Sequence, residues 1–127
     1  MDTSALFGLF VPGDSHHDKA KKIFSDLQKK AEFWVLNLVI QETATVLSYK
    51  VDHKISLLFL EKFSSLGLVC MPIDESLEKE AWRIFKDQTK KGTSFIDCAN
   101  LAAIEVYRLD GILSFDSFYP KQFRFSR

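Results

Sequence analysis

The stretch that decides the fold is Phe33-Trp-Val-Leu-Asn-Leu-Val-Ile-Gln-Glu-Thr-Ala-Thr-Val-Leu-Ser-Tyr-Lys50. Its first four residues form a short continuous apolar run, which is typical of a buried strand. A helical pattern follows at once, from about Leu38 to Lys50. One stripe of this helix is apolar: Ile40, Ala44, Leu47 and Val51. A buried strand joined directly to a helix is the unit from which parallel α/β sheets are built.

The same alternation of short apolar runs and helical patterns continues on both sides of this stretch. A helical run starts near Ala5, and longer helices are predicted at about 16–30, 53–65, 75–88 and 94–109. Further strands are predicted at 68–71, 111–114 and, as an edge strand, 123–125. Strands that alternate with helices through short links indicate a parallel sheet covered on both faces. We therefore expect one α/β domain over residues 1–127, built as a three-layer α/β/α sandwich with a central parallel sheet.

The composition restricts how this chain could hold a charged partner. Hydrophobic residues make up 46% of the sequence, and the 17 basic residues balance the 17 acidic ones. Proteins that bind nucleic acid by electrostatics alone usually carry a clear basic excess. Binding of nucleic acid would therefore need local groups of basic residues or a bridging cation. One such group is Lys121, Arg124 and Arg127, for which the simplest interpretation is solvated surface.

The cysteines and the apolar runs predict the compartment. Cys70 and Cys98 are far apart and show no metal-ligand spacing, so we expect two buried thiols in a reducing compartment. No run approaches the ~18 apolar residues that a membrane-spanning helix needs. We therefore expect a cytoplasmic protein without a membrane segment.

Four acidic residues fall where an open parallel sheet places function, outside the carboxyl ends of its strands. Asp116 follows the strand at 111–114, and Asp2 lies where a first strand would finish. Glu42 lies in the first turns of the helix after the strand that ends at Leu36. Asp97 lies in the first turn of the helix that leads into the third strand. All four carboxylates could gather at one edge of the sheet.

The chemistry of such a group points to a metal ion. Four carboxylates within a few Å repel one another and would take up protons if nothing compensated their charge. A hard divalent cation, Mg²⁺ or Mn²⁺, would keep them ionised and could bridge to a phosphodiester. Each acid also has a plain structural interpretation. Asp2 could cap the helix at Ala5, Asp97 could complement a helix dipole, Asp116 could be a turn residue, and Glu42 could be an exposed glutamate.

The residues around these acids resemble the four motifs of the PIN domain family. Asp2-Thr-Ser-Ala-Leu is similar to its opening motif, and Val39-Ile-Gln-Glu-Thr43 to the segment that bears its glutamate. Thr93-Ser-Phe-Ile-Asp-Cys-Ala99 and Ser114-Phe-Asp-Ser-Phe118 resemble the third and fourth motifs. Their order and spacing agree over essentially the whole chain, and the compact size looks most like the VapC-type toxins. The resemblance implies a PIN-like α/β/α sandwich.

The resemblance also implies a function. It suggests a Mg²⁺- or Mn²⁺-dependent endoribonuclease, with metal-ligand or water-activating roles carried by Asp2, Glu42, Asp97 and Asp116. Ser4 and Ser114 would orient these carboxylates. Such toxins commonly form homodimers and are inhibited by a small antitoxin protein.

One departure from the family leaves an alternative open. The family usually has three to five apolar residues before its first aspartate, completing the central strand, and here only Met1 precedes Asp2. Either the chain starts upstream of Met1 or its central strand is truncated. With a disabled site, the domain would act as a catalytically impaired interaction module.

Overall fold

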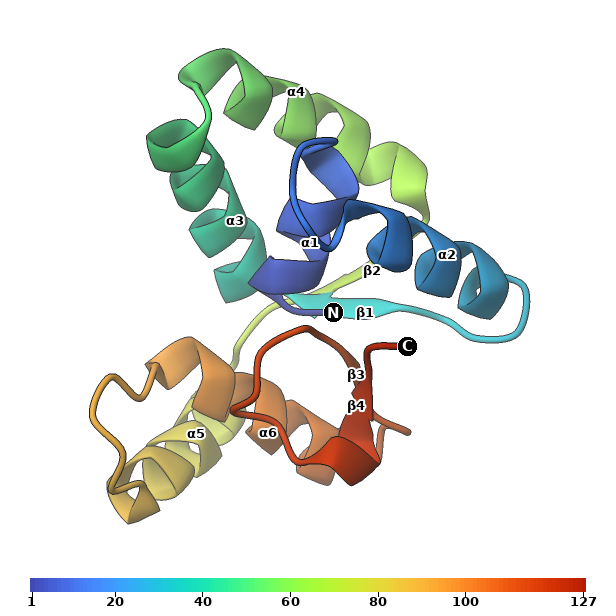
Figure 1. The fold of residues 1–127 in the computed structure, drawn as a ribbon. Helices are drawn as coiled ribbons and strands as arrows, with labels where there is room; N and C mark the ends of the chain where they lie inside the picture. Colours follow the sequence, from blue (N-terminus) through green and yellow to red (C-terminus); the bar gives the residue numbers. More distant parts are fainter.

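Two pairs of short parallel strands form the middle of the molecule (Figure 1). The structure is a computed structural model that describes residues 1–127. Strand β1 (Trp34–Leu36) pairs with β2 (Val69–Met71), and β3 (Ile112–Leu113) pairs with β4 (Arg124–Phe125). All four predicted strands are thus present, each shorter than its apolar run, and the pairing is parallel as expected.

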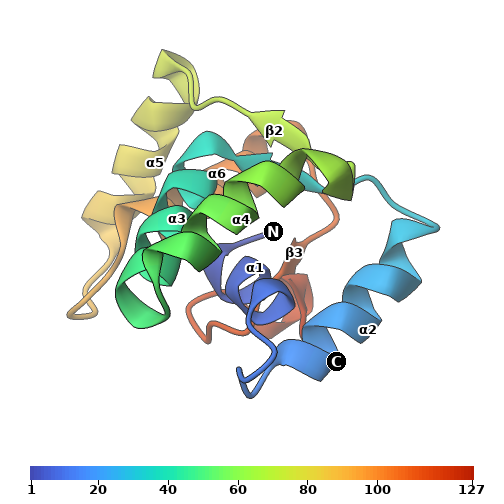
Figure 2. The ribbon, with the colours of Figure 1, turned by 90° about the horizontal axis from the view of Figure 1, so that it is seen from above.

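Six helices enclose these strands. They are α1 (Thr3–Phe10), α2 (His17–Gln28), α3 (Asn37–Lys50), α4 (His53–Phe63), α5 (Glu75–Asp87) and α6 (Phe95–Tyr107). Two 3-10 turns, η1 (Ser64–Leu66) and η2 (Lys121–Phe123), complete the elements. Figure 1 shows α1 to α4 gathered on one side of β1, with α5 and α6 on the other. Helices α3 and α4 pack side by side, as do α5 and α6 (Figure 2). The predicted α/β class, with helices on both sides of parallel strands, is confirmed.

Local signals explain where several helices begin and end. Asp74 caps α5 by accepting a hydrogen bond from the Leu77 amide at 2.8 Å. Ser94 caps α6 in the same way, with the Ile96 amide at 3.1 Å. After η1 the chain turns at Gly67, whose φ of 69° lies in the left-handed region that glycine adopts without a steric penalty. These signals place α5 and α6 within two residues of their predicted ends.

The apolar stripe predicted for α3 is wrong in detail. Its buried residues are Val39, Thr43 and Leu47, whereas Val51 lies beyond the helix and is 42% exposed. Thr43 can occupy the core because its hydroxyl donates to the Val39 carbonyl at 2.7 Å, which leaves no unpaired donor. A pattern that counts threonine as polar therefore assigns the wrong face.

One of the two cysteines also differs from the prediction. Cys98 is buried in α6 as expected, but Cys70 is exposed. Cys70 lies in β2, which pairs only with β1 and is therefore an edge strand. An apolar run in an edge strand need not be buried on both faces.

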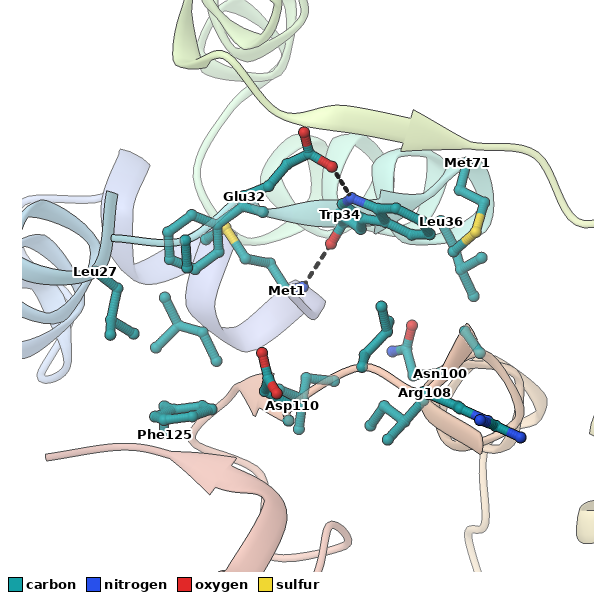
Figure 3. A pocket seen from close by; sticks show the side chains of 18 residues that line it. Met1, Leu27, Glu32, Trp34, Leu36, Met71, Asn100, Arg108, Asp110 and Phe125 are labelled. Atoms are coloured by element: carbon teal, nitrogen blue, oxygen red, sulfur yellow. Dashed lines mark hydrogen bonds between the residues drawn. The ribbon is translucent and has the colours of Figure 1, made fainter. Parts of the chain in front are cut away.

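The first two residues join the strand pairs. The Met1 ammonium donates to the Trp34 carbonyl at 2.8 Å, and the Asp2 amide donates to the Leu113 carbonyl at 3.3 Å. Beside Met1 lies a largely apolar cavity of about 430 Å³. Residues of both strand pairs line it, among them Leu36 of β1 and Phe125 of β4 (Figure 3). Burial lowers the pKa of the Met1 ammonium to about 6, and the charge of Asp2 offsets part of this shift. None of the helices has the length and apolar character needed to cross a bilayer.

Candidate functional site

Asp2 lies at the start of α1, between the two strand pairs, and is only 3% exposed. Its Oδ1 accepts hydrogen bonds from the Ser4 hydroxyl at 2.8 Å and from the Ala5 amide at 3.1 Å. Its Oδ2 accepts from the Ser114 hydroxyl at 2.5 Å. Burial raises the pKa of Asp2, and these hydrogen bonds oppose the increase. Asp2 is therefore an N-cap, as one interpretation of the sequence proposed, and it is also a buried carboxylate held by three donors.

Glu42 lies in the second turn of α3 and is half-buried. Its Oε1 accepts a hydrogen bond from the Thr3 hydroxyl at 2.5 Å. Thr3 follows Asp2 directly, so this contact links the glutamate to the segment that carries the first aspartate. Glu42 is thus not an ordinary exposed glutamate. Its other oxygen, Oε2, has no hydrogen bond from the protein.

Asp97 lies in the first turn of α6, where Ser94 also accepts a hydrogen bond from its amide at 3.4 Å. Its Oδ1 accepts from the Tyr119 hydroxyl at 2.9 Å, and the Asn100 side-chain amide donates to the same hydroxyl at 2.9 Å. Burial, together with the negative charges of the other three acids, raises the pKa of Asp97 to about 6, while the Tyr119 hydrogen bond opposes this shift. The Oδ2 atom of Asp97 remains without a protein partner.

Asp116 lies two residues after Ser114 in the loop that leaves β3. Its amide donates to the Ser114 hydroxyl at 3.0 Å, and its Oδ1 accepts from the Phe118 amide at 2.9 Å. This last bond is the Asx-turn geometry of a turn aspartate. Its main-chain carbonyl accepts a hydrogen bond from Nη1 of Arg124 at 2.9 Å. Oδ2 of Asp116 is free of protein hydrogen bonds.

The four acids lie in one region of the molecule without converging at ligand distances. Asp116, Asp2 and Glu42 each contribute, in that order, to the electrostatic increase in the pKa of Asp97. Three of the carboxylates keep one oxygen without a protein hydrogen bond: those of Glu42, Asp97 and Asp116. No three acidic, histidine or cysteine side chains are close enough together to hold a metal ion in this structure. The arrangement is therefore a group of mutually repelling carboxylates with free oxygens, chemistry that suits a hard divalent cation.

Sequence reasoning did not find several residues that hold these acids. Tyr119 belongs to an aromatic tail whose side chains the pattern assigns to core packing, and it is indeed 1% exposed. Its hydroxyl contact with Asp97 joins positions that are 22 residues apart, and no local spacing signals such a pair. Thr3 and Asn100 have the same long-range character, whereas Ser4 and Ser114 contact Asp2 as the motifs implied.

Comparisons with known proteins agree on one family and one fold. The family model for the PIN domain matches residues 1–121. The crystal structure of VapC20 from Mycobacterium tuberculosis, a toxin that cleaves the sarcin–ricin loop, superimposes with a TM-score of 0.80. The two chains share 23% identity, and the similarity covers 91% of this chain and 87% of VapC20. A comparison with curated proteins finds no match.

Proposed function

Because the chain belongs to the PIN domain family, we propose that it is a divalent-cation-dependent endoribonuclease of the VapC type. One observation carries this proposal. Carboxylates from four separate segments lie near enough to one another that Asp2, Glu42 and Asp116 all raise the pKa of Asp97. Keeping like charges together disfavours ionisation, and a fold retains such a group most readily where a cation compensates it.

The residues that would hold Mg²⁺ or Mn²⁺ are Asp2, Glu42, Asp97 and Asp116. The free oxygens of Glu42, Asp97 and Asp116 are hard donors of the kind that these ions prefer. When bound, the ion would supply positive charge for the scissile phosphate and lower the pKa of a water molecule. Zero net charge is then no obstacle to binding a polyanion.

The side chains around the acids have their own roles in this proposal. Ser4 and Ser114 hold both oxygens of Asp2 in place, and Thr3 fixes one oxygen of Glu42. Tyr119 fixes Oδ1 of Asp97 and leaves Oδ2 available. With its Oδ2 free of protein partners, Asp97 suits a metal-ligand or water-activating role in this proposal.

The decisive experiment is cleavage of total RNA with and without Mn²⁺, compared between the natural protein and two matched variants. Asp97→Asn removes a charge at the site, and Asp87→Asn removes one from an exposed aspartate that pairs with Arg83 at 3.9 Å. We expect Mn²⁺-stimulated cleavage by the natural protein and by Asp87→Asn. Cleavage by Asp97→Asn should be lower by about a hundredfold or more. Equal cleavage by Asp97→Asn would exclude this site.

The biological setting belongs to the same proposal. We extend the proposal to a cytoplasmic toxin that forms a homodimer and is inhibited by a small antitoxin. Likeness to VapC20, a toxin that cleaves the sarcin–ricin loop, supports the RNA substrate. Helix α4 exposes Leu57 (50%) and Leu60 (49%), and apolar side chains of this kind suit a protein partner. Size-exclusion chromatography of the purified protein tests the dimer. Co-purification with the product of an adjacent small open reading frame tests the antitoxin.

A second function is favoured by one observation, namely that no three acids are close enough to hold a metal ion. The domain would then be a catalytically impaired interaction module. This alternative predicts tight binding of a partner with no Mn²⁺-stimulated turnover under any condition, so the cleavage experiment separates the two.

A further inference from the structure

Three basic residues of the last seven positions surround one cavity. Lys121, Arg124 and Arg127, together with Phe125 and Ser126, line a cavity of about 410 Å³. None of these lining side chains is acidic. The sequence pattern predicts solvated surface for this basic group, whereas in the structure its side chains line a cavity. Such a cavity has the charge and the donors to bind an anion.

The side chain of Arg124 is held at this cavity by the main chain of Asp116. Its Nη1 donates to the main-chain carbonyl of Asp116 at 2.9 Å. Its Nε is buried and is the one buried side-chain nitrogen or oxygen without a hydrogen-bond partner. The remaining guanidinium nitrogen, Nη2, makes no hydrogen bond within the protein and is not among the buried unpaired atoms. The charge and planar donors of a guanidinium suit phosphate oxygens.

The strand pairing places the cavity beside the acids. Strand β4 runs parallel to β3, with Leu113 opposite Phe125. The Ser114 amide donates to the Phe125 carbonyl at 3.3 Å. Since parallel strands end at the same edge, Ser126 and Arg127 leave the sheet where Ser114 leads toward Asp116. The part of the cavity formed by Arg124 and Arg127 therefore lies beside the segment that carries Asp116.

We propose that the cavity formed by Lys121, Arg124 and Arg127 binds a phosphate of the RNA backbone, next to the phosphate that is cleaved. This inference rests on the proposed nuclease function and adds a substrate-binding site to it. A chain of zero net charge would thus hold RNA through a cation-bridged contact at the acids and a direct contact here. A phosphate contact orients the strand without reading its bases.

The test measures RNA binding by a protein that does not cleave. Asp97→Asn serves as the background, and a short fluorescein-labelled single-stranded RNA is titrated at fixed Mg²⁺ over a series of NaCl concentrations. Lys121 and Arg127 are exposed, so the double change Lys121→Gln with Arg127→Gln removes two charges from the surface. Lys90→Gln with Lys91→Gln removes two exposed charges between α5 and α6 and is the matched control.

We expect the cavity variant to lose affinity on the order of tenfold at low salt. The slope of log affinity against log salt should fall by about 0.7, the value for one phosphate contact to a single strand. The control should retain the affinity and the slope of the background protein. Equal affinity of the cavity variant and the background, or an equal loss in the control, would overturn the proposal.

A second variant tests the guanidinium of Arg124 rather than its charge. Arg124→Lys keeps the positive charge but cannot donate to the Asp116 carbonyl and to a phosphate from one planar group, so we expect weaker RNA binding with an unchanged salt slope. Its thermal unfolding, compared with that of the background protein, verifies that the fold is kept. Unchanged affinity in Arg124→Lys would contradict a phosphate contact from the guanidinium.

The outcomes also separate this proposal from the nuclease function. If the natural protein cleaves RNA but the cavity variant binds RNA like the background, only the phosphate site is wrong. If the natural protein does not cleave but the cavity variant loses RNA affinity, the cavity binds an RNA phosphate without a cleaved one beside it, and the nuclease proposal fails.

Discussion

The Tyr119 hydroxyl lies 2.9 Å from Oδ1 of Asp97 and donates a hydrogen bond to that carboxylate. The Asn100 side-chain amide donates to the same hydroxyl at 2.9 Å. Asn100 and Asp97 lie one turn apart on α6, so both ends of this chain of hydrogen bonds start from one helix. The loop after β3 thus supplies the residue that orients an acid on α6.

Tyr119→Phe should therefore lower both the stability of the protein and its affinity for Mn²⁺. Without the hydroxyl, the buried Asn100 amide loses its acceptor, which should lower the free energy of unfolding by about 1–3 kcal/mol. Mn²⁺ should also bind more weakly because Asp97 is no longer held. Urea unfolding and calorimetric Mn²⁺ titration measure the two effects. Tyr49→Phe, at a residue that is 87% exposed, should leave both unchanged. A Tyr119→Phe protein as stable as the natural one would refute the role of this hydrogen bond.

Ser114→Ala should destabilise the protein in a pH-dependent way. Ser114 is fully buried and donates to Oδ2 of Asp2, a hydrogen bond that favours the ionised carboxylate. Its removal should lower the free energy of unfolding by about 1.5–3 kcal/mol near neutral pH. The pKa of Asp2 should rise further, so the difference from the natural protein should shrink as acid protonates Asp2. Denaturant unfolding at several pH values measures this. Ser117→Ala, at an exposed serine, is the control, and a deficit that does not change with pH would contradict the account.

The buried Met1 ammonium predicts a gain in stability as pH rises from about 6 to 8. Its pKa is about 6 in the folded protein against 8.0 for the ordinary terminus. Folding therefore expels a proton in this window, and the unfavourable burial of charge disappears once the terminus is neutral in both states. Two pKa units correspond to roughly 2 to 3 kcal/mol. The raised pKa values of Asp97 and Asp2 act in the opposite direction, because a carboxylate that binds its proton more tightly in the folded protein lowers stability as pH rises toward that pKa. The contribution of Met1 is therefore the difference between proteins with and without its ammonium group.

Denaturant unfolding across this pH range, with and without Nα-acetylation, tests the assignment. The acetylated protein has no ammonium group to titrate, so the gain in stability between pH 6 and 8 should be smaller than in the natural protein. If both forms show the same slope, another group is responsible.

Gly111→Ala should destabilise the junction of β3 and β4. A Cβ atom at position 111 would lie 2.3 Å from the Phe123 carbonyl oxygen, far inside van der Waals contact. That oxygen belongs to the backbone and cannot move as a side chain can, so the two segments must separate. We expect a loss of about 1–3 kcal/mol and a lower melting temperature. Gly13→Ala, at a position with open space around it, should have little effect. Equal melting temperatures for the two variants would contradict this explanation.

Much of the fold followed from local patterns. Asp74 and Ser94 announce helices because a side chain that caps a helix acts within three residues of itself. The strands were found because their apolar runs are short and bounded by helices or turns. The patterns failed where burial depends on distant neighbours. Thr43 is a core residue through a hydrogen bond to its own helix, and Cys70 is exposed because β2 has no second neighbour.

The candidate site was predictable in its acids more than in their surroundings. Asp2, Glu42, Asp97 and Asp116 stand beside recognisable short motifs, and the resemblance named them together. Tyr119 and Arg124 could not be assigned in this way, because their partners lie on other elements. The basic group near the C-terminus was visible as a composition, but only the path of β4 arranges it around a cavity.

Beside the Met1 cavity, the hydrogen bonds that link the two strand pairs are those of Met1 to Trp34 and of Asp2 to Leu113. Glu42, on α3, belongs with the β1–β2 pair, whereas Asp97 and Asp116 belong with the β3–β4 pair, and Asp2 lies at the junction. A cation bound by acids of both pairs would oppose the separation of the two pairs. Because it binds the folded domain, its binding would increase the free energy of unfolding. Melting temperature should consequently climb with cation concentration, making thermal denaturation a sensor of site occupancy even in a variant that cuts nothing.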